Sequence, residues 1–508
     1  MANEIKPQFH SLNEYGQPVG GSPINHWNER TILSFDGGGV KGYASLLVLQ
    51  GLMRAIARIE SEHLDGPHSS SFLPRDPPTC EQISASGTLP NEASNIKPNV
   101  SQTPRLDGFL PCHYFDYMIG TSTGGLNAIM LGRLRMSIEE CISLYPAMAR
   151  DVFKKPKKKI LRILLRPKYN AKGLEIQIKQ IVEMRTPRQS QHRDIFSKYE
   201  SPEDLCKTIV IAKSINGPLL EKPYLFRTYD NSYVPQDYSL HIRNPGRANT
   251  DHIWQVARAI SAAYSYLDGM DIEGIEYTDG GLGFNNPTVT GFTEVYLKEG
   301  CYNKTTSGAP RRLTINHVVS VGTGSKPEPV VDKVKRRLRP RRIAKTTDQI
   351  HRAVEHLTDV FENSLTMSIM MGLGSRPYFR FQVGPEVGGL KLDQWKEHDS
   401  LGIGKPSTKT IIETVVREFL INEESQITAC AKLLVDLRRA RIREDSGRWN
   451  RFTYCTYFLC PSCSTRKNTH AEARRHFLTN HQDEDQPEDL DTLIRDSEKQ
   501  PMFTGGPY

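Results

Sequence analysis

Residues 119–128 read IGTSTGGLNA, and the fold can be worked out from this stretch. A β-type run that starts at Phe115 leads into it, the pattern Gly-x-Ser-x-Gly follows, and a helix-compatible stretch comes next. The glycines permit a tight strand-to-helix turn, which lifts the side chain of Ser122 clear of the backbone. Because a serine in any glycine-rich turn shares this pentapeptide, the flanking strand and helix carry the interpretation. The context predicts a nucleophile elbow with Ser122 as the nucleophile.

Strand-like and helical stretches alternate around this turn. The β-type runs are residues 31–35, 115–119, 208–212 and 317–321, and helical spacing of apolar residues marks 43–58, 350–361 and 411–442. This alternation is typical of a sheet covered by helices. We therefore expect an α/β fold.

A second glycine-rich loop, residues 36–42 (DGGGVKG), follows the first β-type run. Without side chains, Gly37, Gly38 and Gly39 can turn successive backbone N–H groups toward one point, as in an oxyanion hole. The alternative is a phosphate-binding loop, but Lys41 is followed by glycine, whereas a P-loop lysine is followed by serine or threonine. The loop is therefore the predicted oxyanion hole.

Asp279 precedes two glycines, in a turn from which its carboxylate could reach a serine on another element. An ordinary Asp-Gly turn is the plain alternative. No histidine has glycines of this kind beside it, and the positions of His113, His252 and His317 are more typical of structural residues than of a catalytic base. A carboxylate can act as a base when it is held at hydrogen-bond distance in a partly desolvated site. A Ser122–Asp279 dyad therefore fits the sequence better than a triad.

These three motifs, in this order, resemble those of the patatin-like phospholipases. Residues 257–263 (ARAISAA) and 320–324 (SVGTG) also resemble family stretches, and the similarity covers roughly residues 31–326. The resemblance implies a three-layer α/β/α fold, a Ser-Asp dyad, and calcium-independent cleavage of lipid acyl esters with no catalytic cofactor. It also implies a membrane or droplet surface as the place of work. Residues 60–108 depart from the family pattern, and we expect them to be a flexible insertion.

A second group of residues near the end of the chain has the spacing of a two-cysteine, two-histidine zinc finger. The candidate metal ligands are Cys460, Cys463, His476 and His481. Lys467 and Ala473 stand where such a finger usually has an aromatic residue and a leucine, so part of its usual core is lost. Four protein ligands leave no open position for a reactive water, so we predict a structural zinc ion and a module that needs it to fold.

The net charge of +8 is unevenly distributed. Residues 154–159 (KKPKKK) run into the apolar and basic stretch 160–166, residues 333–345 are also basic, and residues 483–491 are acidic. Solvated loops are the plain explanation of such runs. The sharper interpretation is attraction to anionic lipid headgroups or to nucleic acid.

The rest of the composition is that of an ordinary globular protein, with 37% hydrophobic and 24% charged residues. The sequence contains no run of about 18 apolar residues, which is the length needed to span a membrane. Residues 1–28 lack the basic start and the apolar run of a secretory signal. The nine cysteines are an odd number, so we expect reduced thiols rather than disulfides. We expect a cytoplasmic protein, peripheral on membranes or partly nuclear, that is not secreted.

The sequence thus predicts a three-layer α/β/α domain with a helical C-terminal extension and a small zinc-finger-like module. The expected parts are an N-terminal segment (1–28), a catalytic domain (29–330), a basic linker and helical extension (331–450), a finger (451–482) and an acidic flexible tail (483–508).

The leading function is a lipid acyl hydrolase of the phospholipase A or lysophospholipase type, which acts on phospholipid or another acyl lipid at a membrane surface. In this interpretation the finger binds a protein or a nucleic acid. The alternative is a regulatory or nucleic-acid-associated protein that uses both parts for binding. All three hydrolase motifs are intact, which favours the enzyme.

Overall fold

The computed structural model describes residues 25–61, 70–72, 106–153, 167–185, 197–202, 204–216, 222–231, 244, 246, 248–249, 251–263, 266–302, 314–324, 360–373, 376–399, 406–454, 457–463, 465–467, 470–481 and 489–499. Several sequence predictions fall wholly or largely outside these residues: the N-terminal segment 1–28, the basic stretches 154–166 and 333–345, the helix 350–361, most of the insertion 60–108, and both ends of the acidic tail. No helix in the described part of the chain is long and apolar enough to cross a membrane.

One large sheet forms the centre of the molecule, in the order β5-β6-β3-β2-β1-β7-β8, with β4 also paired to β3. The strands are β1 (Glu29–Phe35), β2 (Tyr117–Thr121), β3 (Lys207–Ser214), β4 (Pro223–Arg227), β5 (Met270–Ile272), β6 (Ile275–Asp279), β7 (Thr314–Val321) and β8 (Tyr378–Phe381). The five strands from β3 to β8 in this order are parallel, while β4, β5 and β6 pair antiparallel. The carboxyl ends of parallel strands lie at the same edge of the sheet. The glycine-rich turns that follow β1 and β2 are therefore close together.

Successive side chains of the central strands enter two different cores. In β2, Met118 packs in the larger core while its neighbours Tyr117 and Ile119 pack in the smaller one. In β3, Val210 and Ile211 divide between the two cores in the same way. Because adjacent residues of a strand point to opposite faces, both faces of this sheet must be covered by helices.

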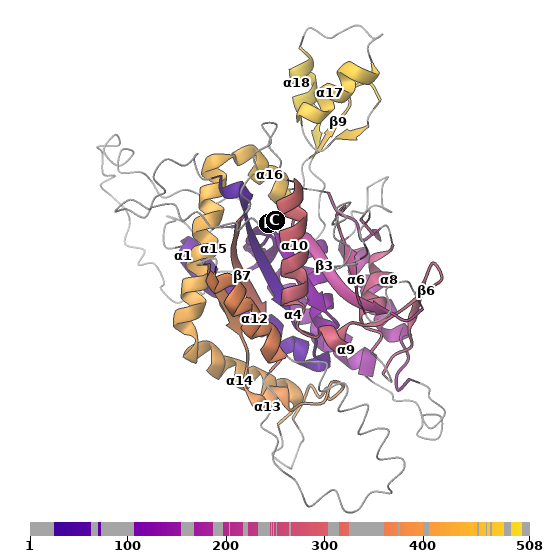
Figure 1. Ribbon diagram of the computed structural model, residues 1–508, viewed down its shortest axis with the longest axis vertical. Helices are drawn as coiled ribbons and strands as arrows, with labels where there is room; N and C mark the ends of the chain where they lie inside the picture. Colours follow the sequence, from indigo (N-terminus) through magenta and orange to yellow (C-terminus); the bar gives the residue numbers. More distant parts are fainter. Residues whose placement is uncertain are drawn as a thin grey trace, which may run out of the picture.

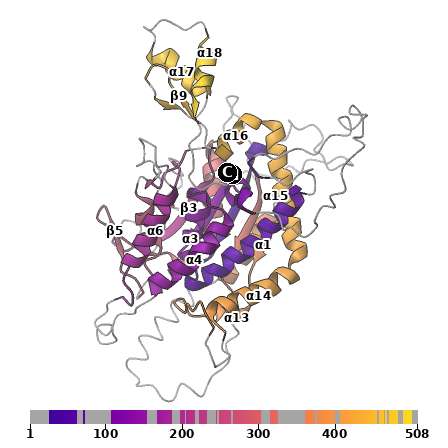
Figure 2. The same cartoon turned by 180° about the vertical axis from the view of Figure 1, so that it is seen from behind.

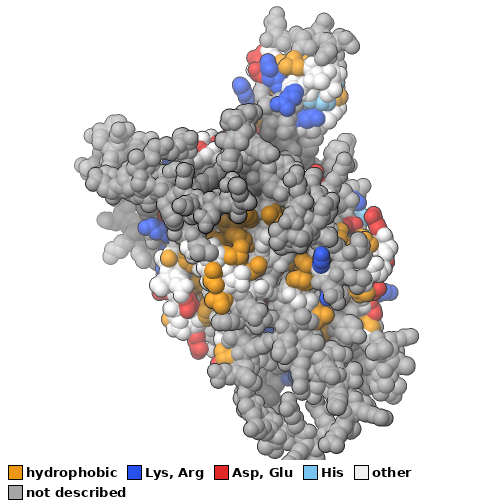
Figure 3. All heavy atoms as spheres, viewed as in Figure 1, with side chains coloured by type: hydrophobic (Ala, Val, Ile, Leu, Met, Phe, Trp, Pro, Cys, Tyr) orange, Lys and Arg blue, Asp and Glu red, His pale blue; other side chains and the backbone are white. Residues whose placement is uncertain are grey.

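Helices cover both faces, which makes three layers (Figures 1 and 2). One face carries α1 (Gly42–Ser61), α3 (Thr123–Ala128), α4 (Ile138–Phe153), α6 (Lys172–Arg185) and α8 (Ile253–Ile260), and the other carries α10 (Thr288–Tyr302) and α12 (Val360–Leu373). Apolar side chains gather on the outer side of the second layer (Figure 3), where the exposed ones are Tyr296, Leu365, Ile369 and Met370. The predicted α/β/α class is confirmed.

The described part of the C-terminal extension belongs to the same body. It contains β8, α13 (Pro385–Gly388), α14 (Thr408–Asn422), α15 (Glu424–Glu444) and α16 (Ser446–Tyr454), and α14 and α15 pack along α1. Glu60 at the end of α1 is buried and pairs with Arg438 and Arg439 of α15 at 2.6 and 3.1 Å. A buried carboxylate without these partners would be strongly unfavourable, so α1 and α15 are held together. The described part of the extension therefore packs directly against the expected domain 29–330.

A small module stands apart from this body at the far end of the molecule (Figures 1 and 2). Its elements are a three-stranded sheet of β9 (Tyr457–Leu459), β10 (Arg466–Lys467) and β11 (Glu498–Lys499), and the helices α17 (His470–Asn480) and α18 (Leu490–Asp496).

Residues 489–499, expected within a flexible tail, instead complete this module. Leu490 and Ile494 of α18 are buried against Phe458, Ala473 and Phe477, and β11 pairs with β9. Burial of the apolar side chains of α18 stabilises this packing. The acidic residues around them had predicted a flexible tail instead.

Candidate active site

Ser122 lies in a strained turn between β2 and α3. Its backbone has φ 55° and ψ −128°, which is uncommon for a residue with a side chain. The turn has no room for side chains on either side: a Cβ on Gly120 would lie 2.2 Å from the Gly124 carbonyl oxygen, and one on Gly124 would lie 2.5 Å from the Phe35 oxygen. The predicted elbow geometry is thus present, and the glycines are sterically required.

The structure brings Ser122 and Asp279 together. The Ser122 Oγ donates a hydrogen bond to Asp279 Oδ2 at 2.5 Å. The second carboxylate oxygen, Oδ1, accepts a hydrogen bond from the Gly281 amide at 2.7 Å. This second bond fixes the carboxylate in orientation, so one of its oxygens is directed at the serine hydroxyl.

Burial raises the pKa of Asp279 to about 6, while the hydrogen bonds from Ser122 and from the Gly281 amide lower it in part. The residue is only 7% exposed. A carboxylate with this proton affinity is ionised at neutral pH, yet it accepts a proton more readily than an exposed aspartate does. These are the properties that a general base needs.

The glycine-rich loop runs beside this pair, and its amides are divided between two roles. The Gly37 amide donates to the Asn285 carbonyl at 2.9 Å, and the Val40 amide donates to the Leu392 carbonyl at 2.9 Å. In the part of the chain that the structure describes, the Gly38 and Gly39 amides have no hydrogen-bond partner. Of the three predicted oxyanion donors, Gly38 and Gly39 therefore remain available, whereas Gly37 is already engaged.

Carbonyl groups of the same loop are held by side chains. Thr323 Oγ1 donates to the Gly37 oxygen at 2.8 Å, and the Tyr145 hydroxyl donates to the Gly39 oxygen at 2.9 Å. A Cβ on Gly38 would lie 2.6 Å from Thr323 Oγ1, and Gly39 has φ +59° with its α-carbon packed against Leu392. The loop is fixed in one conformation and has no space for larger residues.

The three histidines considered in the sequence have other partners. His113 Nδ1 lies 2.8 Å from Ser71 Oγ, His252 Nδ1 lies 3.1 Å from Ser197 Oγ, and His317 Nδ1 lies 2.7 Å from Asn316 Oδ1. Burial lowers the pKa of both His113 and His317. None of the three contacts Ser122 in the described structure, so the geometry favours a dyad over a triad.

Sequence reasoning missed Arg380 in β8. Its guanidinium pairs with the carboxylate of Asp36, the first residue of the glycine-rich loop, at 2.9 and 2.5 Å. Asp36 is 1% exposed, and burial raises its pKa although Arg380 opposes the rise. Arg380 lies beyond the basic stretch 333–345 and is not next to a glycine-rich motif. Nothing in the neighbouring sequence therefore indicates a functional role for this arginine.

The four predicted metal ligands come together in the small module. One ligand atom from each of Cys460, Cys463, His476 and His481 lies within 4.8 Å of all the others. Cys463 Sγ is 3.2 Å from His476 Nε2, and hydrogen bonds from Thr465 and His476 lower the pKa of Cys463 to about 5. Two sulfur and two imidazole donors at this spacing fit a tetrahedral zinc site.

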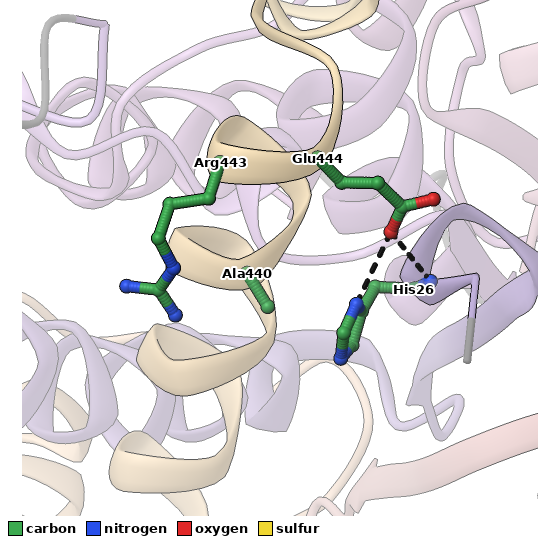
Figure 4. A pocket seen from close by; sticks show the side chains of 4 residues that line it. All are labelled: His26, Ala440, Arg443 and Glu444. Carbon is green, nitrogen blue, oxygen red and sulfur yellow. Dashed lines mark hydrogen bonds and ion pairs between the residues drawn. The ribbon is translucent and has the colours of Figure 1, made fainter. Parts of the chain in front are cut away.

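A surface hollow of about 340 Å³ lies between η1 (His26–Asn28) and α15 (Figure 4). It is lined by His26, Ala440, Arg443 and Glu444, and both the His26 backbone amide and its ring bond to Glu444. It shares no residue with the pair of Ser122 and Asp279, and its lining provides no nucleophile. We assign no role to it.

Comparison with known proteins agrees with this geometry. Residues 102–290 match the model of the patatin-like phospholipase family. They form a patatin-like domain. The match contains both Ser122 and Asp279, whereas the glycine-rich loop lies before it and Arg380 after it. In the structure, Ser122, Asp279, the glycine-rich loop and Arg380 all lie on or next to strands of the same large sheet.

Individual relatives of the patatin-like domain are distant. The chain is 24% identical to Phospholipase A I of Arabidopsis thaliana over 56% of its length, and 28% identical to an 85/88 kDa calcium-independent phospholipase A2 of Mus musculus over 42%. It is 24% identical to Patatin-like protein 1 of Oryza sativa over 60%. The alignments cover 23%, 23% and 62% of these three relatives.

Proposed function

We propose that this protein hydrolyses acyl esters of lipids, with Ser122 as the nucleophile and Asp279 as its general base. At family level, the patatin-like domain already indicates a lipid acyl hydrolase. The hydrogen bond of 2.5 Å between the Ser122 hydroxyl and the buried carboxylate of Asp279 carries the assignment of residues. Phospholipid is the substrate class that the names of the relatives suggest, and the sequence adds lysophospholipid as an equal candidate.

The reaction follows from the geometry in two stages. Asp279 takes the proton of Ser122 as Oγ attacks the ester carbonyl, and the Gly38 and Gly39 amides stabilise the negative oxygen that forms. Asp279 then returns the proton to the departing alcohol, which leaves an acyl group on Ser122. A water attacks this acyl-enzyme, Asp279 accepts the proton of the water, and the same proton restores the Ser122 hydroxyl as the fatty acid leaves.

No step in this proposal uses a metal ion. Two relatives carry calcium independence in their names, and we expect the same here. Chelation of calcium should therefore leave hydrolysis unchanged.

The test is an assay of the purified full-length chain against a panel of phospholipids, lysophospholipids and triacylglycerols. Hydrolysis of at least one class should disappear in Ser122→Ala. Ser143→Ala, which removes the exposed hydroxyl of a serine in α4, is the matched control and should retain it. Hydrolysis that persists in Ser122→Ala would refute the assignment.

Membrane attachment is a further part of the proposal, with a cytoplasmic, peripheral site of action. It rests on the sequence of residues 154–166, in which clustered lysines adjoin apolar residues, as in an interfacial segment. Vesicle sedimentation tests it: binding should increase with anionic lipid, decrease with salt, and weaken when Lys157, Lys158 and Lys159 become glutamine. Equal binding to neutral and anionic vesicles would exclude the electrostatic contribution.

We also propose that the small module holds one structural zinc ion and serves as a binding module for a protein or nucleic acid. The convergence of four ligand atoms within 4.8 Å supports the metal. The module exposes side chains of both charges (Figure 3): Arg474 pairs with Asp491 at 3.0 Å, while Arg475 and Arg495 could contact an acidic partner. A protein that uses both parts only for binding is the alternative function, and it requires that Ser122→Ala leave every activity unchanged.

A further inference from the structure

Residues 378–395, here called the strap, run from β8 through α13 and contact the glycine-rich loop 36–42 along its length. Figure 1 shows α13 at the same end of the sheet as α9 (Gly281–Phe284), which follows Asp279. We propose that the strap is the element that positions the oxyanion loop, with Arg380 as its main positioning residue. This inference rests on the proposed hydrolase function.

At the start of the loop, the strap supplies a buried ion pair. Arg380 bonds to both oxygens of Asp36 and also donates to Ser320 Oγ at 2.7 Å. The side chain of Arg380 is 14% exposed and that of Asp36 is 1% exposed, so water screens the pair little. A bidentate contact of this kind fixes direction as well as distance, and Asp36 immediately precedes the glycines.

At the end of the loop, the strap supplies backbone contacts. The Leu392 carbonyl accepts the Val40 amide at 2.9 Å, and the Gly388 carbonyl accepts Lys41 Nζ at 3.3 Å. The Gly38 and Gly39 amides lie between these contacts and the Asp36 ion pair. A run of three glycines has the largest backbone freedom of any sequence, so fixed points at both ends are needed to direct its amides.

An aromatic contact links the strap to the carbonyl side of the loop. The ring of Trp395 packs against Tyr43 and Tyr145 with centroid distances of 5.6 and 6.0 Å, and Tyr145 holds the Gly39 oxygen. The strap itself is tied to the body, because Asp393 accepts hydrogen bonds from the Tyr169 hydroxyl at 2.8 Å and from Lys168.

The decisive experiment measures turnover and amide exchange on the full-length chain. In Arg380→Met, kcat should fall by about 100-fold with little change in KM, as expected for donors that act only in the transition state. Hydrogen exchange of the bonded amides in residues 36–42 should become at least about ten-fold faster. Arg380→Lys should recover part of both properties, because it restores the charge without the bidentate contact.

The matched control is Arg227→Met, which breaks another buried arginine–carboxylate pair, with Glu294 at 2.6 Å. It should lower the melting temperature while kcat and exchange in residues 36–42 stay near wild type. Asp393→Asn, a milder change that loosens the strap, should give an intermediate fall in kcat and keeps the test valid if Arg380→Met fails to fold.

The outcomes separate the two proposals. Absence of any Ser122-dependent hydrolysis in the wild type would refute the hydrolase, whereas the exchange measurement would still decide whether the strap orders the loop. Unchanged exchange in residues 36–42, together with a fall in kcat no larger than that of Arg227→Met, would overturn the role of the strap.

Discussion

The hydroxyl of Ser122 donates to the carboxylate of Asp279 across 157 positions of sequence. Ser122 directly follows β2 and Asp279 ends β6, and these two strands are not neighbours, because β3 lies between them in the sheet. Their contact is therefore set by the register of three strands. Substitutions in β3 that shift this register should disturb the site without touching either residue.

Removal of the base should be as damaging as removal of the nucleophile. Asp279→Asn keeps the shape of the side chain but cannot accept the serine proton, so we expect kcat to fall on the order of 10⁴-fold, as Ser122→Ala should. Ester turnover measures it. Asp271→Asn, which changes an exposed aspartate in β5, is the control and should be neutral. Loss of activity only in a variant of His113, His252 or His317 would point to a triad.

Activity should rise with pH as Asp279 ionises, with a midpoint near its pKa of about 6. A pH profile of kcat/KM on a neutral substrate measures this. The ascending limb should disappear from the residual activity of Asp279→Asn, because no other group in the dyad titrates there. A midpoint near 4 would show that the carboxylate is not desolvated.

The contribution of Asp279 to folding stability should fall with rising pH, whereas activity should rise. The pKa of Asp279 is raised from 3.8 to about 6 by folding, so the protonated form is favoured in the folded state. The contribution of Asp279 to the free energy of unfolding is fully present below pH 3.8 and is lost as pH rises through about 6. Asp279→Asn should therefore be more stable than wild type at pH 8, by at most about 3 kcal/mol. Denaturant unfolding at pH 5 and pH 8 checks it, and a larger gain at pH 5 would contradict the argument.

A side chain on the glycine-rich loop should reduce turnover more than binding. In Gly38→Val the new Cβ would collide with Thr323 and displace the amides, so we expect kcat to fall about 100-fold or more. Gly274→Ala is the control, since Gly274, with φ 82°, lies in a turn with nothing near its α-carbon. Full turnover in Gly38→Val would show that this loop is not the oxyanion hole.

The small module should contain one zinc ion per chain and should not contribute to catalysis. Elemental analysis of protein purified without chelators should find the metal, and Cys463→Ser should lose it and become sensitive to protease between residues 457 and 499. Leu478→Ser, which changes an exposed residue of α17 between the two histidines, should retain the metal. Ester turnover should be equal in all three proteins, and its loss in a folded Cys463→Ser enzyme would contradict independence.

Local patterns in the sequence predicted the elbow, the glycine-rich loop and the metal ligands, because each depends on residues within a few positions. The contact between Arg380 and Asp36 could not be predicted in this way, since it joins positions 344 apart and neither residue type is unusual. The helix formed by residues 490–496 does have a signal in the sequence. Leu490, Leu493 and Ile494 have the spacing of a helix face, although acidic neighbours suggested a tail.

The order of strands also determines which fragment of this chain can be studied alone. Residues 102–290, the segment that matches the family, omit β1, β7 and β8. In that fragment the row of backbone groups on β2 that now pairs with β1 would lie open at the sheet edge. Open edges of apolar strands recruit other chains, so the fragment should precipitate on expression, and a usable one has to reach from η1 to α16.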